Sequence, residues 1–129
     1  MLKYVTENEY KELLGKQSIP DNFDNLDIKA STYINHKTYG RIDVNDIPQE
    51  VKYVTCLLID LINEKELKVG NIDNLKSENI EGWSVSYQTA DEIELEYSDR
   101  MYETLQDYLW NTVGSDGNRL LYGGVWLYE

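Results

Sequence analysis

The strongest helical pattern of the chain lies between about residues 48 and 67, and it constrains the fold more than any other stretch. Apolar side chains recur there every three or four residues, at Val51, Val54, Leu57, Leu58, Leu61 and Ile62. That spacing gathers them on one face of an α-helix, which has about 3.6 residues per turn. We expect this segment to be the central helix of the fold.

Three further segments carry helical patterns. A short helix is predicted to begin at the capping box Thr6-Glu7-Asn8-Glu9 and to end at Gly15, because the Thr and Glu side chains can each satisfy an orphan N–H group. A second helix is expected over about residues 22–38, with Asp21 as its N-cap. A last helix is expected over about residues 90–111. Its apolar side chains, four residues apart, are Ile93, Tyr97, Met101, Leu105 and Leu109.

The pattern changes over residues 83–88, where Trp83, Val85 and Tyr87 alternate with small or polar side chains. A period of two is typical of a half-buried strand, and the preceding Gly82 favours a turn. We therefore expect a loop over residues 69–74 and a β-hairpin or extended loop over about residues 75–88. A lone hairpin is marginally stable, so this segment must pack against the chain's own helices or against another molecule.

The expected fold class is mainly α. The chain of 129 residues fits a single domain, residues 1–129, built as a small bundle of about four helices. The hairpin or loop at about 75–88 is inserted before the last long helix, and an extended tail is expected at about residues 118–129.

Composition excludes several classes of protein. Twelve Lys and Arg against 24 Asp and Glu give a net charge of −12, which argues against a non-specific nucleic-acid binder but not against a protein that lies beside DNA. Cys56 is the only cysteine, so an internal disulfide is excluded and a buried, inert thiol is expected. The sequence shows neither a signal-peptide run nor a stretch long enough to span a membrane, which predicts a soluble intracellular protein.

The sequence carries no constellation of residues typical of catalysis. His36 is the only histidine and is expected to be solvated on the polar side of the second helix. Phosphate-binding glycine motifs and nucleophile motifs are absent, and the aspartates at 43–46 lack the order of a calcium loop. We therefore expect no enzyme activity, no cofactor and no metal.

Two groups of residues are candidates for interaction. The first group consists of four of the acidic side chains of the last helix, Glu92, Glu96, Asp99 and Glu103. Repeated around a ring they would form a negative wall that duplex DNA passes without adhering, although an ordinary solvated helix face has the same composition. In the tail, Trp126 and Tyr128 could belong to an edge strand of their own domain or add to a neighbouring molecule.

Several short strings carry a family resemblance. They are Tyr4-Val5-Thr6 before the first helix, the segment 30–33, Val51-Lys52 after Pro48, and Lys76-Ser77-Glu78 followed by Gly82-Trp83-Ser84-Val85-Ser86-Tyr87. The last string is the most distinctive. Over roughly residues 3–110 the chain resembles the phage head-tail connector family, small adaptor proteins that dock beneath a portal.

The resemblance implies a mainly helical subunit that forms a ring on the portal protein, with a dodecamer as one candidate, and continues the DNA channel. It also implies a platform for stopper or tail proteins, and neither catalysis nor a cofactor. Applied to this chain, the resemblance gives seven candidate residues for protein interaction, which are Glu78, Trp83, Val85, Ser86, Tyr87, Trp126 and Tyr128. The charge of −12 favours a monomer or weak oligomer before docking.

Two other functions fit the same sequence. An acidic DNA-mimic inhibitor would lay its carboxylates on one elongated face and bind a basic protein in a salt-sensitive way. A generic helical module would bind a peptide at the hairpin edge and would expose an apolar groove.

Overall fold

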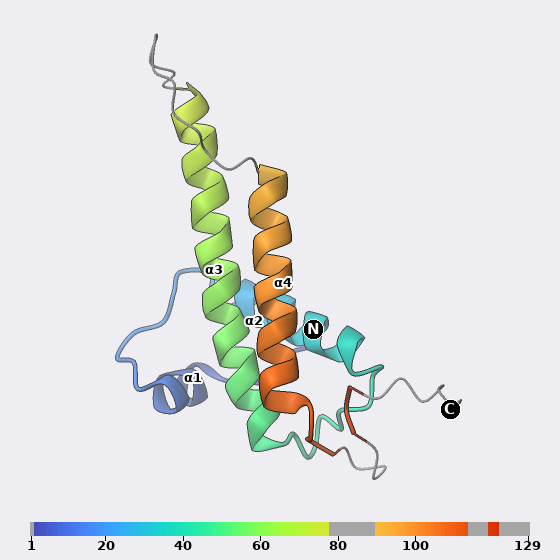
Figure 1. The fold of residues 1–129 in the computed structure, drawn as a ribbon. Coiled ribbons are helices and arrows are strands. Elements are labelled where there is room, and N and C mark those ends of the chain that lie inside the picture. The colour runs from blue at the N-terminus through green and yellow to red at the C-terminus, as the bar shows by residue number, and fades with distance from the viewer. Residues whose placement is uncertain (1, 78–89, 114–118, 122–129) are drawn as a thin grey trace, which may run out of the picture.

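The structure is a computed structural model that describes residues 2–77, 90–113 and 119–121, without the side chains of residues 71–77 and 90. The described part of the chain is mainly helical, as the sequence predicts (Figure 1). Its helices are α1 (Glu7–Leu14), α2 (Phe23–Lys37), α3 (Gln49–Ser77) and α4 (Ala90–Leu109). The predicted bundle of about four helices is therefore confirmed.

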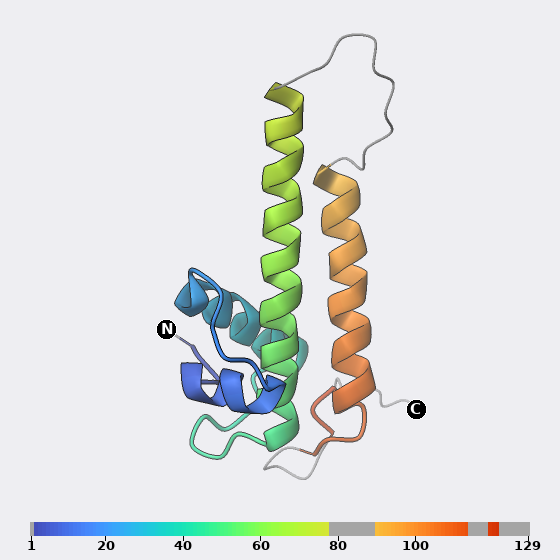
Figure 2. The same ribbon diagram turned by 90° about the vertical axis from the view of Figure 1, so that its left-hand side faces the viewer.

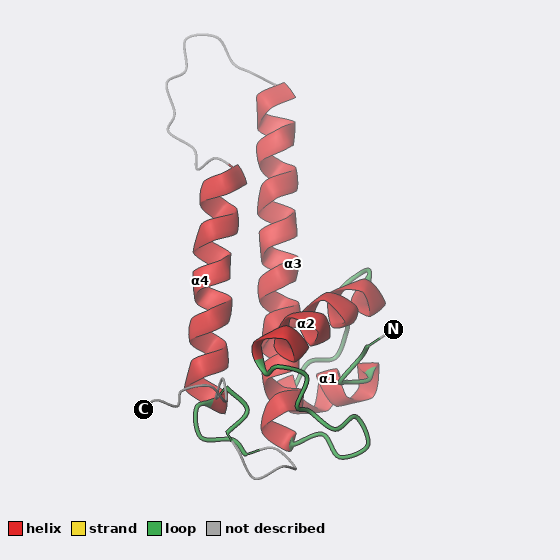
Figure 3. Cartoon of the chain, turned by 90° about the vertical axis from the view of Figure 1, so that its right-hand side faces the viewer, coloured by secondary structure: helices red, strands yellow, loops and turns green. Residues whose placement is uncertain are grey.

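Helix α3 is the centre of the arrangement, because α1, α2 and α4 each pack against it. Helices α3 and α4 run antiparallel as a long pair, while α1 and α2 cover one side of the first half of α3 (Figures 2 and 3). The upper part of α3 rises beyond them and lies beside α4 (Figure 2). We call this upper part, residues 61–77 and 90–100, the arm.

The predicted apolar stripes form the core. All five stripe residues of α4 are buried, and those of α3 are buried or half-buried. The main cluster includes Tyr4, Tyr10, Phe23, Leu26, Ile34, Val51, Val54, Leu58, Ile59, Met101, Leu105 and Leu109. A second, small cluster in the arm contains Ile93 and Tyr97, packed against Leu61 and Val69.

The apolar stripe of α4 contributes residues to both clusters because its residues are four positions apart in the sequence. Each step of four residues advances about 40° around a helix of 3.6 residues per turn, so the stripe winds around α4. Ile93 and Tyr97 consequently face α3 in the arm, whereas Met101, Leu105 and Leu109 face the main cluster.

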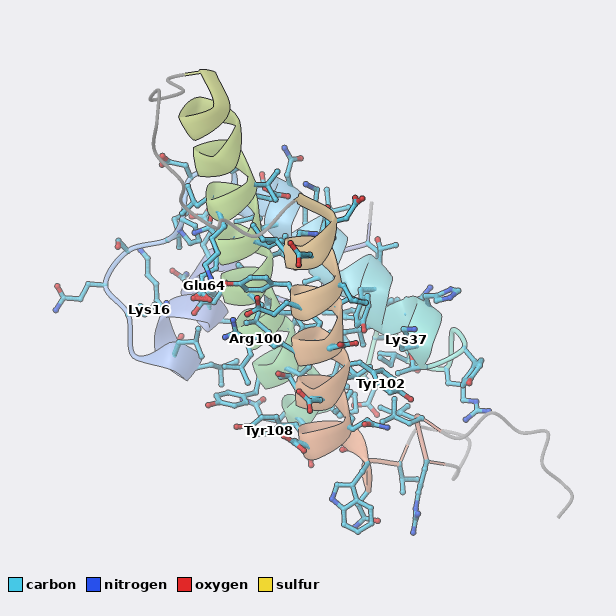
Figure 4. All side chains as sticks on the ribbon, turned by 45° about the horizontal axis from the view of Figure 1, so that its top comes forward. Lys16, Lys37, Glu64, Arg100, Tyr102 and Tyr108 are labelled. Carbon is cyan, nitrogen blue, oxygen red and sulfur yellow. The ribbon has the colours of Figure 1, made fainter. Side chains whose placement is uncertain are left out.

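Polar contacts link the two helices of the arm. Lys65 Nζ lies 3.0 Å from Glu94 Oε1, and Arg100 Nη2 lies 3.9 Å from Glu64 Oε2 (Figure 4). The Arg100 guanidinium also lies 4.7 Å from the ring centroid of Tyr97. Exposed ion pairs contribute little by themselves, so the packing of Ile93 and Tyr97 against α3 contributes more to holding the two helices of the arm together.

The start of α1 agrees with the sequence prediction, whereas the start of α2 does not. At α1 the predicted capping box is confirmed, because the Glu9 N–H donates to Thr6 Oγ1 at 3.2 Å and the Thr6 N–H donates to Glu9 Oε1 at 2.9 Å. At α2 the prediction of Asp21 as N-cap is wrong. Asn22 precedes this helix with a φ of 61° and makes no side-chain capping bond. Asn tolerates this left-handed conformation better than most residues.

The predicted loop over residues 69–74 is wrong, since α3 continues through Gly70 to Ser77. The predicted hairpin is also wrong for residues 75–77, which are helical, while residues 78–88 lie outside the described residues. Packing explains the longer helix: Val69 contacts the arm cluster, and burial there outweighs the roughly 1 kcal/mol that a glycine costs inside a helix. Helix α4 ends at Leu109, two residues before its predicted end at 111.

Replacing Gly70 by Ala should stabilise the protein by about 0.5–1 kcal/mol, because Ala restricts the unfolded chain and favours helix. A Cβ at Gly70 has no heavy atom within 4 Å, so no clash opposes this gain. Urea unfolding followed by far-UV circular dichroism measures the change. Gly15→Ala is the matched control: Gly15 has a φ of +65°, so the same substitution should destabilise. A destabilised Gly70→Ala would contradict a helix that continues through this position.

Candidate functional site

The four predicted acidic residues of α4 lie together on one face of the helix. Glu92, Glu96, Asp99 and Glu103 are four, three and four residues apart, a spacing that keeps them on one side over about 16 Å. This side is opposite the buried stripe, and Glu92, Asp99 and Glu103 are exposed. We call these four residues the acidic face.

Two carboxylates of this face lack an ion pair within the described residues. Ion pairs in this part of the chain include Lys3–Asp24, Lys16–Asp60, Lys29–Glu66, Lys52–Glu9, Lys65–Glu94, Arg100–Glu64 and Arg100–Glu96. Arg100 thus reaches the acidic face, with Nη1 4.0 Å from Glu96 Oε2. Asp99 and Glu103 form no ion pair in this part of the chain. The face therefore presents a local excess of negative charge to solvent.

Exposed aromatic and apolar side chains gather at the other end of the molecule from the tip of the arm. They are Tyr39, Val44, Tyr102, Tyr108, Trp110 and Val113, and we call them the base surface. Tyr102 and Tyr108 lie on the second half of α4 (Figure 4), and the others lie in the connections around its end.

Arginine side chains cover part of the base surface. The Arg119 guanidinium lies 5.6 Å from the Trp110 ring, and the Arg41 guanidinium lies 5.3 Å from the Tyr39 ring. Tyr, Trp and Arg are the residues most enriched in the centres of protein interfaces. The base surface is not among the sites predicted from the sequence, although Tyr108 and Trp110 flank the stripe residue Leu109 and must therefore fall off the buried face.

The single histidine and the single cysteine lie in different surroundings. His36 is exposed, and the described residues contain no cluster of three or more His, Cys, Asp or Glu that could hold a metal ion. Cys56 is buried as predicted, and burial raises its pKa to about 12, which keeps the thiol protonated and unreactive. None of the helices described is both long and apolar enough to cross a membrane.

One acidic side chain of α2, Asp27, is buried in the fold. Asp27 is 1% exposed, and its Oδ1 accepts a hydrogen bond of 3.1 Å from Ser31 Oγ, which in turn accepts one of 2.9 Å from the Tyr4 N–H. Its Oδ2 has no hydrogen-bond partner among the described residues. Burial raises the pKa of Asp27 to about 6, although the Ser31 hydroxyl and the Val5 N–H oppose this shift. The pair Asp27–Ser31 thereby anchors the N-terminal segment to α2.

Asp27 is not among the predicted site residues, although its position in the sequence indicates that it lies on a buried face. It follows Phe23 by four residues and precedes Ala30 by three, so it lies on the apolar stripe of α2. A carboxylate in that position must be buried, paired or protonated.

The remaining predicted interaction residues lie outside the described residues. They are Glu78, Trp83, Val85, Ser86, Tyr87, Trp126 and Tyr128. Comparison of the chain with protein-family models, curated proteins and solved structures gives no match.

Substituting Asp27 by Asn should change how stability depends on pH. Because the folded-state pKa of about 6 exceeds the ordinary value of 3.8, the folded protein binds the proton more tightly, and its stability falls as pH rises from about 4 to about 6. Asn keeps the shape and removes the charge, so the variant should gain up to about 3 kcal/mol relative to the natural chain above pH 6, and little near pH 4.

Urea unfolding of both proteins over this pH range measures the difference. Asp24→Asn is the control, because it removes an exposed carboxylate one turn away on the same helix and leaves the buried carboxylate of Asp27 in place. A pH-independent difference between Asp27→Asn and the natural chain would show that Asp27 does not titrate in this range.

Proposed function

We propose that this chain is a phage head-tail connector, a structural virion protein that forms a ring under the portal. In this role it extends the DNA channel and joins the capsid to stopper or tail proteins. It acts in the host cytoplasm during assembly and then at the head-tail interface of the virion. It has no catalytic step and requires no cofactor.

The observation that carries this proposal is the acidic face of α4. Its four carboxylates share one side of a long helix, opposite the buried stripe, and two of them, Asp99 and Glu103, form no ion pair within the described residues. A ring of such helices would line a channel with negative charge. Duplex DNA is not retained by such a wall, because adhesion requires cations that displace the counterions of the phosphates.

The distribution of charge and apolar surface supports a ring that assembles on a partner. Many of the cations are engaged within the subunit, so one copy offers few for the acidic face of another. Copies with a charge of −12 repel one another in solution. The base surface, in contrast, offers aromatic and arginine side chains of the kind that dock on proteins.

One observation favours a second candidate, the acidic DNA-mimic inhibitor. The acidic face gathers carboxylates on one elongated surface, as a mimic of the phosphate backbone requires. The two functions differ in their partners: structural phage proteins for the connector, and one basic DNA-binding protein for the mimic.

A tagged pull-down from a lysate that produces the corresponding phage particles separates these functions. We expect portal and capsid proteins to copurify, as identified by mass spectrometry. Trp83→Ala or Tyr87→Ala should leave the subunit folded, as judged by circular dichroism, and should block its attachment to portal-bearing heads. Recovery of a single basic DNA enzyme without structural phage proteins would instead establish the mimic and reject the connector.

Charge reversal tests the acidic face directly. Replacing Glu92, Glu96, Asp99 and Glu103 by Lys should leave head attachment intact and slow the release of DNA from assembled particles, because DNA would adhere to the channel. The matched control replaces four exposed acids elsewhere, Glu12, Asp21, Asp46 and Glu50, by Lys, which gives the same net charge. Equal DNA release by the two variants would exclude the acidic face as a channel wall.

A further inference from the structure

A hollow lies where the N-terminal segment meets the first turns of α1 and α2. It has a volume of about 470 Å³, which is within the range of sites that hold a small organic molecule. We call it the N-terminal hollow. Acids outnumber bases among its lining residues, since Glu7, Glu9, Asp24 and Asp27 line it together with the cation Lys3. The charge of this lining favours a cationic ligand.

Asp27 is the buried acceptor of this hollow. Its Oδ1 accepts the hydrogen bond from Ser31, whereas its Oδ2 has no hydrogen-bond partner among the described residues. The Val5 N–H lies close enough to favour the charged form of the carboxyl but completes no hydrogen bond to Oδ2. A buried carboxylate oxygen without a donor is unfavourable, and a cation that donates to it removes this penalty. Asp27 is therefore the residue of the hollow that gains most from a cationic donor.

Lys3 is bound to another carboxylate of the hollow. Its Nζ lies 3.4 Å from Asp24 Oδ1, and the two side chains are 41% and 71% exposed. An exposed ion pair contributes little to stability, so a competing cation can displace Lys3 from Asp24. Glu9 is paired with Lys52, and Glu7 is exposed and forms no ion pair within the described residues. The hollow thus keeps an excess of negative charge.

The arrangement of these acids favours an extended organic cation. The acids that line the hollow do not form a group that could hold a metal ion, as is true of all the described residues. Asp24 and Asp27 are three residues apart on α2, so their Cβ atoms are neighbours on the helix, about 5–6 Å apart. A short aliphatic chain with an ammonium group at each end can span the two carboxylates. Each ammonium carries three hydrogen-bond donors, which suits one end to the buried oxygen and the other to the exposed acid.

We propose that the N-terminal hollow binds a linear aliphatic diamine, with one ammonium donating to Asp27 Oδ2 and the other paired with Asp24 in place of Lys3. The Lys3 side chain moves aside to admit the ligand, and Glu7 adds negative potential at the entrance. The bound diamine strengthens the attachment of the N-terminal segment to α2, because Asp27 is linked through Ser31 to the Tyr4 N–H. This inference does not depend on the connector function.

Isothermal titration calorimetry of the full chain with putrescine, a four-carbon diamine, tests this site at pH 7. We expect saturable binding at one site. Asp27→Asn should weaken it at least about tenfold, because the buried charge that the ammonium pairs with is lost. Lys3→Met should strengthen it about two- to fivefold, because the competing ammonium is removed, and butylamine, with a single ammonium, should bind about two- to fivefold more weakly than putrescine. Saturating putrescine should also lower the pKa of Asp27 below about 6, as followed by carbon NMR of its carboxyl group.

Asp46→Asn and Lys11→Met are the matched controls, because they make the same changes of charge outside the hollow and should leave the affinity unchanged. Equal affinity of Asp27→Asn and the natural chain would overturn the proposal. So would an equal loss in Asp46→Asn, since putrescine would then respond only to the net charge of the protein. An Asp27 carboxyl resonance and pKa that putrescine leaves unchanged would reject the site without any substitution. Equal binding of butylamine and putrescine would reject the second contact, at Asp24, and with it the assignment of a diamine.

Discussion

Burial of the apolar stripe of α3 is the interaction on which the rest of the structure depends. The other three described helices each pack on α3, and the main cluster includes Val51, Val54, Leu58 and Ile59 from this helix. A buried aliphatic side chain contributes about 1.5–3 kcal/mol, so these few residues outweigh the exposed ion pairs of the surface. The polar contacts set the positions of the helix ends, and the stripe holds the helices together.

Burial of apolar side chains also determines where the candidate functional surfaces lie. Helix α4 buries one residue in four along a winding stripe, which leaves the opposite side free to carry Glu92, Glu96, Asp99 and Glu103. Past Leu109 the stripe ends, and Trp110, which follows it, is exposed. The acidic face and the base surface therefore both lie where residues of the chain are no longer buried in the core.

Helical periodicity predicted the elements and the acidic face, because both follow from spacing along one chain. The features that it missed depend on contacts between segments. Gly70 is predicted as a loop residue until α4 packs beside Val69, and the spacing of Asp27 indicates the apolar face of α2 but not the hydrogen bonds that link it through Ser31 to Tyr4. The base surface combines residues about 70 positions apart, such as Tyr39 and Trp110, so no local pattern reveals it.

The continuity of α3 has a mechanical consequence. One unbroken helix of 29 residues passes through both apolar clusters. Its first half packs against α1, α2 and α4, whereas its upper half packs mainly against α4 and is linked to α2 by the ion pair Lys29–Glu66. Because α3 is continuous, a displacement of its upper end is transmitted to the main cluster through the helix itself rather than through a loop.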